Sequence, residues 1–211
     1  MRKGDATRER LLEIAEAAVL SKGFGATSID EIIAEAEITK SGFFYHFRDK
    51  NELANAMLVR YVETNNAMFD QIFARADDLA DGDPLQSFLI GLKLLAEVMA
   101  DLPSGHPGCL IASIVYQERL FNKQTRDLTT QSVLYWNAFF RERIAAIAAN
   151  YPQQEPVDVE QIARMVSCIV DGSIIMGKTL GDASIVPQQI LMMRSYVKLV
   201  FQPGVAIRAA A

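Results

Sequence analysis

The stretch ITKSGFFYHFRDK, residues 38–50, places several aromatic rings, a histidine and positively charged side chains in one short segment. Two small residues, Ser41 and Gly42, stand directly before the rings. The segment holds three Lys or Arg residues and one Asp, a charge of +2, whereas residues 30–37 hold four acidic residues and no basic one. Positive charge and ring surface are therefore concentrated on one element.

The composition of the whole chain excludes several classes of protein. Half of the 211 residues are hydrophobic, which is enough to bury a substantial core. No run of about 18 apolar residues lacks a charge, and the N-terminal segment is amphipathic, so neither a membrane span nor secretion is expected. The two cysteines, Cys109 and Cys168, make no disulfide framework and favour the reducing cytoplasm. The net charge of −5 is not the basic excess that is typical of nucleic-acid-binding proteins.

Helical periodicity extends along the chain. Apolar residues recur at three- and four-residue steps and no region shows sustained alternation, so the fold is predicted to be all-α. Gly23 ends one helix, Pro84 stands in the first turn of another, and residues 102–108 break the pattern. The predicted helices cover residues 5–22, 27–36, 40–47, 49–75, 84–101, 109–120, 122–150, 158–180 and 187–202.

The short helices 27–36 and 40–47, with the helix before them, have the arrangement of a helix-turn-helix unit. Ser28 followed by Glu31 fits a capping box, and Thr39 is placed to cap the second helix. In such units the second helix enters the major groove of DNA with its early residues facing the bases. Residues 40–47 are therefore the predicted recognition helix.

The residues of this helix suit contact with DNA. Ser41 and Gly42 are small enough to let the backbone approach closely. Thr39 and Lys40 lie at the helix N-terminus, where free N–H groups and the helix dipole favour a phosphate. Three further residues offer hydrogen-bonding groups or positive charge to phosphates and bases, namely Tyr45, His46 and Lys50.

The aromatic residues also have an ordinary interpretation as core. Phe43 and Phe47 are four residues apart, share a helix face and are expected to be buried. Phe44 and Tyr45 turn away from that face and are expected to be exposed. His46 is a residue type that more often serves structure, and it could equally hold the turn into the next helix.

The stretch FGATSIDEIIAEAEITKSGFFYHFRDKNELANAML, residues 24–58, resembles the DNA-binding domain of the TetR family of one-component bacterial regulators. The resemblance covers residues 8–58, and the spacing agrees as well as the residue types. The matching elements are Gly23-Phe24, Thr27-Ser28-Ile29, Ile32, Ala36, Ile38-Thr39-Lys40, Tyr45-His46-Phe47, Lys50 and Glu52-Leu53.

The resemblance implies an all-α homodimer that binds a pseudo-palindromic DNA operator. Residues 1–50 would form the helix-turn-helix domain, the helix 49–75 a connector, and residues 51–211 the ligand-binding and dimerisation domain, paired through its last two helices. The expected function is a transcriptional repressor released by a small-molecule effector, with an activator of the same fold as the alternative. Family positions that touch DNA match Ser28, Thr39, Lys40, Ser41, Tyr45, His46 and Lys50.

The sequence departs from the family pattern at three places. Glu37 stands where the turn usually carries glycine, and a non-glycine residue at positive φ costs of order 1 kcal/mol. Ser41 precedes Gly42 where the family often has glycine first, and Phe44 replaces a tyrosine that could bind phosphate. These departures bear on sequence preference more than on DNA binding itself.

The C-terminal helices carry more apolar surface than one helix face needs. A dimer interface is the favoured interpretation and a bundle core the alternative for Ile162, Met165, Val166, Ile169, Ile174, Ile190, Met193, Val197 and Val200. Asp171 interrupts this surface and is expected either to pair at the interface or to line a cavity. The candidate residues for an effector pocket are Met99, His106, Cys109, Tyr116, Trp136, Phe139, Phe140 and Cys168.

Two other functions compete with the regulator. Cys109 with His106 could form a thiolate–imidazole pair, but only two residues, proline and glycine, separate them and no orienting residue is evident, so no enzyme is expected. A helical adaptor for proteins would not need Lys40, Tyr45 and Lys50. The histidines are far apart and the cysteines lack ligand spacing, so neither a metal site nor a cofactor is expected.

Overall fold

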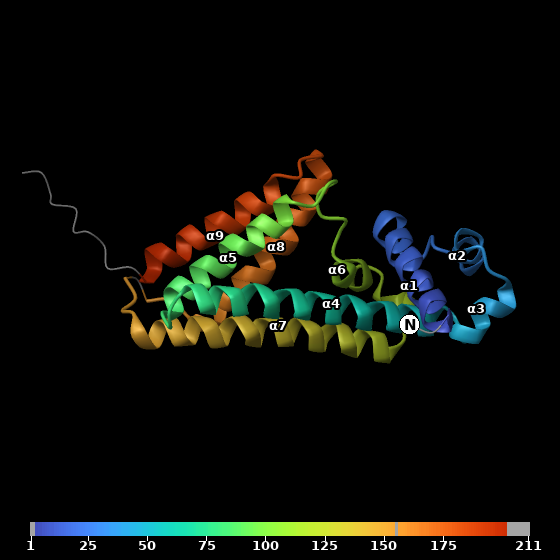
Figure 1. Cartoon of the computed structure of the whole chain (residues 1–211), viewed down its shortest axis with the longest axis horizontal. Helices are drawn as coiled ribbons and strands as arrows, with labels where there is room; N and C mark the ends of the chain where they lie inside the picture. The colour runs from blue at the N-terminus through green and yellow to red at the C-terminus, as the bar shows by residue number, and fades with distance from the viewer. Residues whose placement is uncertain (1–2, 155, 202–211) are drawn as a thin grey trace, which may run out of the picture. The chain divides into compact units, whose positions relative to one another are not determined.

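The computed structural model describes residues 3–154 and 156–201, and the regular elements in these ranges are all helical (Figure 1). The all-α prediction is confirmed. Within these ranges, no helix has both the length and the apolar character that crossing a membrane requires. The elements in chain order are α1 (Lys3–Lys22), α2 (Ile29–Ala36), α3 (Lys40–His46), α4 (Lys50–Leu79), α5 (Pro84–Ala100), α6 (Leu110–Val115), the 3₁₀ helix η1 (Glu118–Leu120), α7 (Lys123–Asn150), α8 (Val159–Leu180) and α9 (Ile185–Phe201).

The chain forms two compact units. The first contains the described residues up to Asn66 together with Pro107–Val133, and the second contains Ala67–His106 together with the described residues from Leu134 onward. The long helices α4 and α7 each contribute residues to both units. The functional division at residue 50 expected from the sequence stays a prediction.

The core of the first unit forms where α1 packs on α2 and α2 packs on α3. Leu11, Ala15 and Val19 supply the buried stripe of α1, at the spacing of one helix face. Phe43 and Phe47 are fully buried, as the periodicity of residues 40–47 predicts. The short helix α3 is therefore anchored by rings, which leaves its other face for solvent.

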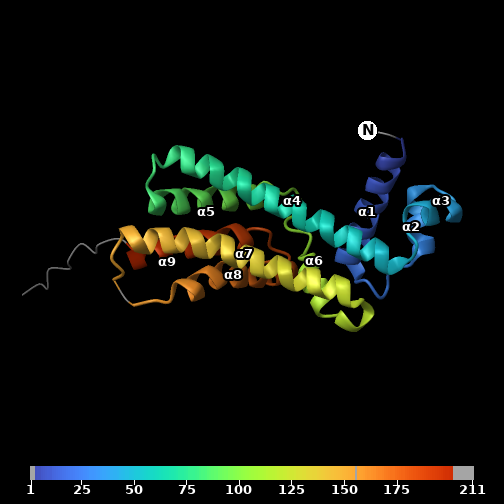
Figure 2. The same cartoon turned by 90° about the horizontal axis from the view of Figure 1, so that it is seen from below.

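The core of the second unit is a cluster of phenylalanine rings beside a helix layer. Helix α9 packs along both α5 and α8 (Figures 1 and 2). The Phe73 and Phe139 ring centroids are 5.3 Å apart in an edge-on arrangement, and Phe88 and Phe140 join the cluster. A Cβ atom on Gly91 would lie 2.3 Å from the Phe73 ring, so only glycine permits this approach.

The apolar residues predicted for a dimer face belong mainly to the core of one protomer. Seven of the nine are buried in the second unit, and Met165 and Ile169 pack partly buried against it. The alternative interpretation, a bundle core, therefore holds for the seven buried residues. Each helix also has a second apolar stripe that faces outward. The exposed apolar residues of α8 and α9 are Ile175, Met176, Leu180, Leu191, Met192, Tyr196 and Leu199.

Two helices differ most from the prediction. Helix α4 continues to Leu79, and the single helix expected over residues 109–120 is divided into α6 and η1. The division falls at Gln117, whose φ and ψ of −124° and 28° are not helical. Its side-chain oxygen accepts a hydrogen bond from the Gly25 N–H at 3.0 Å. This tertiary contact has no signature in the local sequence.

Candidate nucleic-acid interface

Hydroxyl groups fix the first turns of α2 and α3. Ser28 Oγ accepts the Glu31 N–H at 3.2 Å, and Thr39 Oγ1 accepts the Gly42 N–H at 3.1 Å. Each bond satisfies an N–H group that a helix start leaves without a partner. The Thr39 and Ser41 hydroxyl oxygens also lie 3.0 Å apart. Ser28 and Thr39, both predicted DNA contacts, are thus helix caps in the free protein.

The turn between α2 and α3 requires a left-handed residue, and Glu37 takes that conformation. Its φ and ψ are 55° and 42°. The Glu37 N–H donates to the Ala34 carbonyl and the Ile38 N–H donates to the Ile33 carbonyl, each at 3.2 Å. These two bonds form the Schellman pattern, which usually has glycine at the left-handed position. The hydrogen bonds hold the turn although a non-glycine side chain costs about 1 kcal/mol there.

Helix α3 presents an aromatic and polar face to solvent. The Tyr45 side chain is 82% exposed and Phe44 is 45% exposed, as the sequence predicts. Ser41 is exposed next to them, and Gly42 adds no side chain. The half-buried His46 ring meets the Tyr45 ring nearly edge-on, with centroids 5.0 Å apart. An exposed phenol at the recognition helix can donate to phosphate or to a base edge.

Lys40 is an accessible cation at the start of this face. Its Nζ lies 3.2 Å from Asp30 Oδ1, and the two side chains are 67% and 77% exposed. Exposed ion pairs contribute little to stability, so this one is readily exchanged for a contact with phosphate. Arg48, between α3 and α4, is more exposed still and pairs with Asp49 at 3.4 Å. The positive charge of residues 38–50 thus includes two cations open to solvent.

Lys50 has a different environment from Lys40. Its Nζ donates to the Phe24 carbonyl at 2.6 Å and lies 4.1 Å from the centroid of the Phe24 ring. Burial lowers the pKa of the Lys50 ammonium group. The structure therefore brings six of the seven predicted DNA contacts to the α2–α3 segment and gives the seventh, Lys50, partners within the protein.

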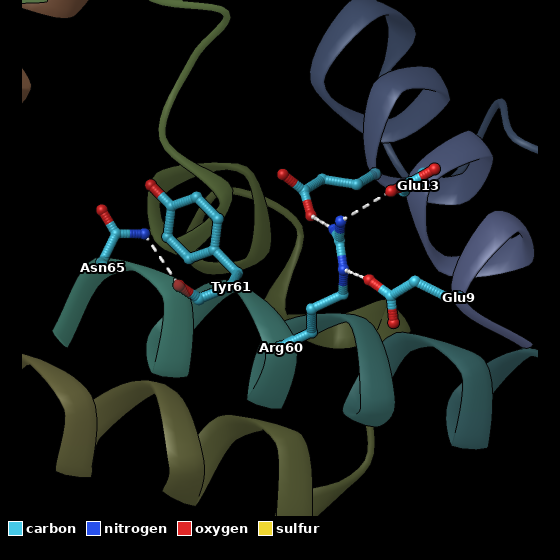
Figure 3. A network of polar contacts seen from close by, with 6 residues as sticks. Glu9, Glu13, Arg60, Tyr61 and Asn65 are labelled. Carbon is cyan, nitrogen blue, oxygen red and sulfur yellow. Dashed lines mark hydrogen bonds and ion pairs between the residues drawn. The ribbon is translucent and has the colours of Figure 1, made fainter. Parts of the chain in front are cut away.

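Sequence reasoning missed a charged cluster that joins α1 to α4. Arg60 on α4 pairs with Glu9, Glu13 and Glu16 of α1, at 3.3 Å for Glu13 and 2.8 Å for Glu16 (Figure 3). Burial raises the pKa of Glu16, and the neighbouring Arg60 opposes this only in part. The glutamates recur every three or four residues, a signal for one charged helix face, but their cation lies far along the chain.

The candidate effector residues occupy several different places. Met99 and Phe140 are buried in the core of the second unit, where Trp136 and Phe139 contact the Phe69 ring. Tyr116 is a surface residue and Cys109 Sγ caps α6 by accepting the Ala112 N–H. These residues include core, capping and surface positions, so their shared role in a pocket stays a prediction.

Two of the candidates line cavities of the second unit. Cys168 lines a cavity of about 430 Å³ with Ile169, Gly172 and Met176 among its other walls. His106 lines a separate cavity of about 260 Å³ next to α8. Burial and the neighbouring Lys178 charge lower the pKa of His106. Within the described residues, no group of three His, Cys, Asp or Glu side chains could hold a metal ion.

Comparison with known proteins identifies the fold and the DNA-binding unit. Residues 11–57 match the family described as "Bacterial regulatory proteins, tetR family", a range that contains α2, α3 and the start of α4. The chain is 27% identical over 172 residues to the "Probable HTH-type transcriptional regulator ArpR" of Pseudomonas putida, covering 80% of this chain and 78% of that one. Residues 11–57 therefore carry the DNA-binding segment of the TetR family.

Two further comparisons show how far the TetR-family likeness extends. The transcriptional repressor NemR of Escherichia coli (strain K12) is 38% identical over 55 residues, which is 26% of this chain and 28% of NemR. A TetR transcriptional regulator from Chloroflexus aurantiacus superposes with a TM-score of 0.79 at 22% identity, covering 97% of this chain and 100% of that chain. The sequence likeness to NemR is thus confined to a short segment, whereas the fold likeness covers nearly the whole chain.

Proposed function

We propose that the protein is a ligand-responsive transcriptional repressor that binds a pseudo-palindromic DNA operator as a homodimer. The observation that carries this proposal is the exposed face of α3, where Lys40, Ser41 and Tyr45 stand on a buried aromatic base. NemR, a transcriptional repressor similar in sequence, favours repression over activation. A DNA-binding regulator acts where the chromosome is, so the cytoplasm is the proposed location.

The proposed dimer forms through α8 and α9. These helices bury one apolar stripe in their own protomer and leave a second stripe exposed, including Met176, Leu180, Met192 and Leu199. Exposed apolar surface of this kind marks protein interfaces when it is contiguous. A two-fold dimer would present two recognition helices to two half-sites of an operator, whose symmetry would match that of the protein.

The proposed effector site lies in the second unit, where the Cys168 cavity has apolar walls and a few polar groups. An effector that binds one dimer geometry more tightly than another would shift the population away from the DNA-binding state. The free energy that couples the two sites is typically about 1–3 kcal/mol in such systems.

The test is a gel shift with fragments of the protein's own genomic neighbourhood at two salt concentrations. We expect one discrete complex that weakens steeply with salt, because phosphate contacts release counterions. Lys40→Ala and Tyr45→Ala should each weaken the complex about tenfold or more, while both variants stay folded dimers. Unchanged affinity in both variants would contradict the placement of the recognition helix.

A further inference from the structure

We infer that Lys50 is a positioning residue, whose ammonium group holds the turn between α1 and α2 and does not contact DNA phosphate. The inference rests on the proposed function, because the role of this turn is to place the recognition helix on DNA. It departs from the role that the family resemblance implies for Lys50.

Two interactions hold the Lys50 ammonium group against one residue. Its Nζ donates a short hydrogen bond to the Phe24 carbonyl, 2.6 Å, and lies 4.1 Å from the centroid of the same residue's ring. A charged donor strengthens a hydrogen bond, and a cation over an aromatic face adds attraction that grows as water is excluded. Phe24 is buried, so the ammonium group is attached to a fixed point of the fold.

The turn is held by other side chains as well, which makes it a defined junction. The Phe24 and Phe121 ring centroids are 4.3 Å apart, and Gln117 Oε1 accepts the Gly25 N–H at 3.0 Å. Thr27 Oγ1 donates to the Gly23 carbonyl at 3.0 Å. Gly23 has a φ of 84°, a left-handed conformation that favours glycine at this point of the turn. Residues from several parts of the chain thus contact the turn and hold it in place.

The turn determines where α3 lies because the two are connected through α2. Ser28, the cap of α2, follows the turn directly, and α2 packs on α3. Releasing Phe24 from Lys50 would let the start of α2 shift, and α3 would shift with it. Small displacements of recognition groups weaken contacts that depend on direction, such as those from Lys40 and Tyr45.

Lys40, in the same unit, is accessible to a phosphate in a way that Lys50 is not. Its side chain is 67% exposed and its partner Asp30 is a solvated carboxylate, which a phosphate can replace. Lys50 is half-buried, and taking it to a phosphate would deprive the Phe24 carbonyl of its charged donor. The lowered pKa of Lys50 agrees with an ammonium group partly removed from water.

The test compares Lys50→Met with the matched control Lys40→Met in the full-length protein. Operator affinity is measured over a range of salt concentrations, using the fragment found by gel shift or one selected from random DNA. The plot of log K against log salt has a negative slope, and loss of one phosphate contact makes this slope shallower by about 0.9. We expect a change of up to this size for Lys40→Met, because Asp30 takes up a cation when Lys40 leaves it. Lys50→Met should instead lose about tenfold in affinity at every salt concentration with the slope unchanged.

If the slope of log K against log salt became as shallow in Lys50→Met as in Lys40→Met, Lys50 would be a phosphate contact and the inference would be overturned. Wild-type affinity in Lys50→Met would also overturn it. Circular dichroism shows whether the variant is folded at the temperature of measurement. If it is not, Lys50→Gln, which keeps a donor for the Phe24 carbonyl, takes its place with a smaller loss expected and the same unchanged slope.

A second measurement needs no DNA and separates this inference from the proposed function. In the free ¹⁵N-labelled protein, Lys50→Met should shift the backbone amide resonances of α2 and α3, because these helices move with the turn. Lys40→Met should shift only its immediate neighbours. Undisturbed α3 amides in Lys50→Met would overturn the positioning role, whereas absence of any operator complex with wild-type protein would refute the proposed function instead.

Discussion

The helices around the recognition element and the helices α5, α8 and α9 are stabilised in different ways. In the first unit, short helices begin at hydroxyl caps, a left-handed glutamate closes one turn, and Arg60 joins three carboxylates. In the second unit, long helices bury a ring cluster and a continuous apolar layer. The first arrangement depends on charge state and salt, and the second depends on packing volume.

The largest expected effect comes from removing a ring in the second unit. Phe73→Ala should lower the free energy of unfolding by about 3–5 kcal/mol, because it leaves a cavity where the buried ring packs against Gly91 of α5. Urea unfolding followed by circular dichroism measures this loss. Phe44→Ala, which truncates a ring that is 45% exposed, is the control and should cost much less. Equal losses would show that burial of the ring does not determine the cost of its removal.

The next effect should come from the charged cluster and should depend on pH. Arg60→Met should lower the free energy of unfolding by about 2 kcal/mol near neutral pH, because it leaves Glu16 partly buried without its cation. The loss should shrink as pH falls, since burial raises the pKa of Glu16 and protonation removes the buried charge. A carboxyl with a raised folded-state pKa stabilises the fold below its ordinary value of 4.5, and this contribution is lost as pH rises.

The control for the charged cluster is Arg48→Met, since the Arg48 side chain is 83% exposed and pairs only at the surface. We expect it to change the free energy of unfolding by less than about 0.5 kcal/mol at any pH. A loss in Arg60→Met that stayed constant between acidic and neutral pH would show that Arg60 acts through packing of its stem and not through the carboxylates.

The smallest expected effect is a gain at the helix turn. Glu37→Gly should raise the free energy of unfolding by about 0.5–1 kcal/mol, because glycine adopts the left-handed conformation without the steric cost of a Cβ atom. Glu35→Gly, in the last helical turn of α2, is the matched control and should lose about 1 kcal/mol. Destabilisation by Glu37→Gly would mean that the glutamate side chain makes a compensating contribution.

Local sequence signals predicted the recognition unit because its structure is decided locally. The hydroxyl caps at Ser28 and Thr39 act within three residues, and helix periodicity separates buried Phe43 from exposed Tyr45. The left-handed conformation of Glu37 agrees with the family resemblance, in which this position of the turn usually carries glycine. Each of these features depends on neighbours that the sequence shows side by side.

The features that sequence reasoning missed depend on contacts between distant parts of the chain. Lys50 meets a carbonyl 26 residues away, and Gln117 reaches Gly25 over 92 residues. The apolar residues of α8 could face either inward or outward by periodicity alone, because the helix has two apolar stripes. The tertiary packing of α5 and α9 decides between them, and no local pattern records that choice.

The ion pair of Lys40 with Asp30 has a consequence for the ions around the protein. Asp30 acts as an intramolecular counterion, so Lys40 need not hold a dissolved anion before it meets DNA. When a phosphate takes Lys40, Asp30 is left facing a polyanion and must draw a cation from solution. Part of the positive ion cloud that DNA releases is thereby taken up again at the protein surface, which lessens the entropy gained on binding.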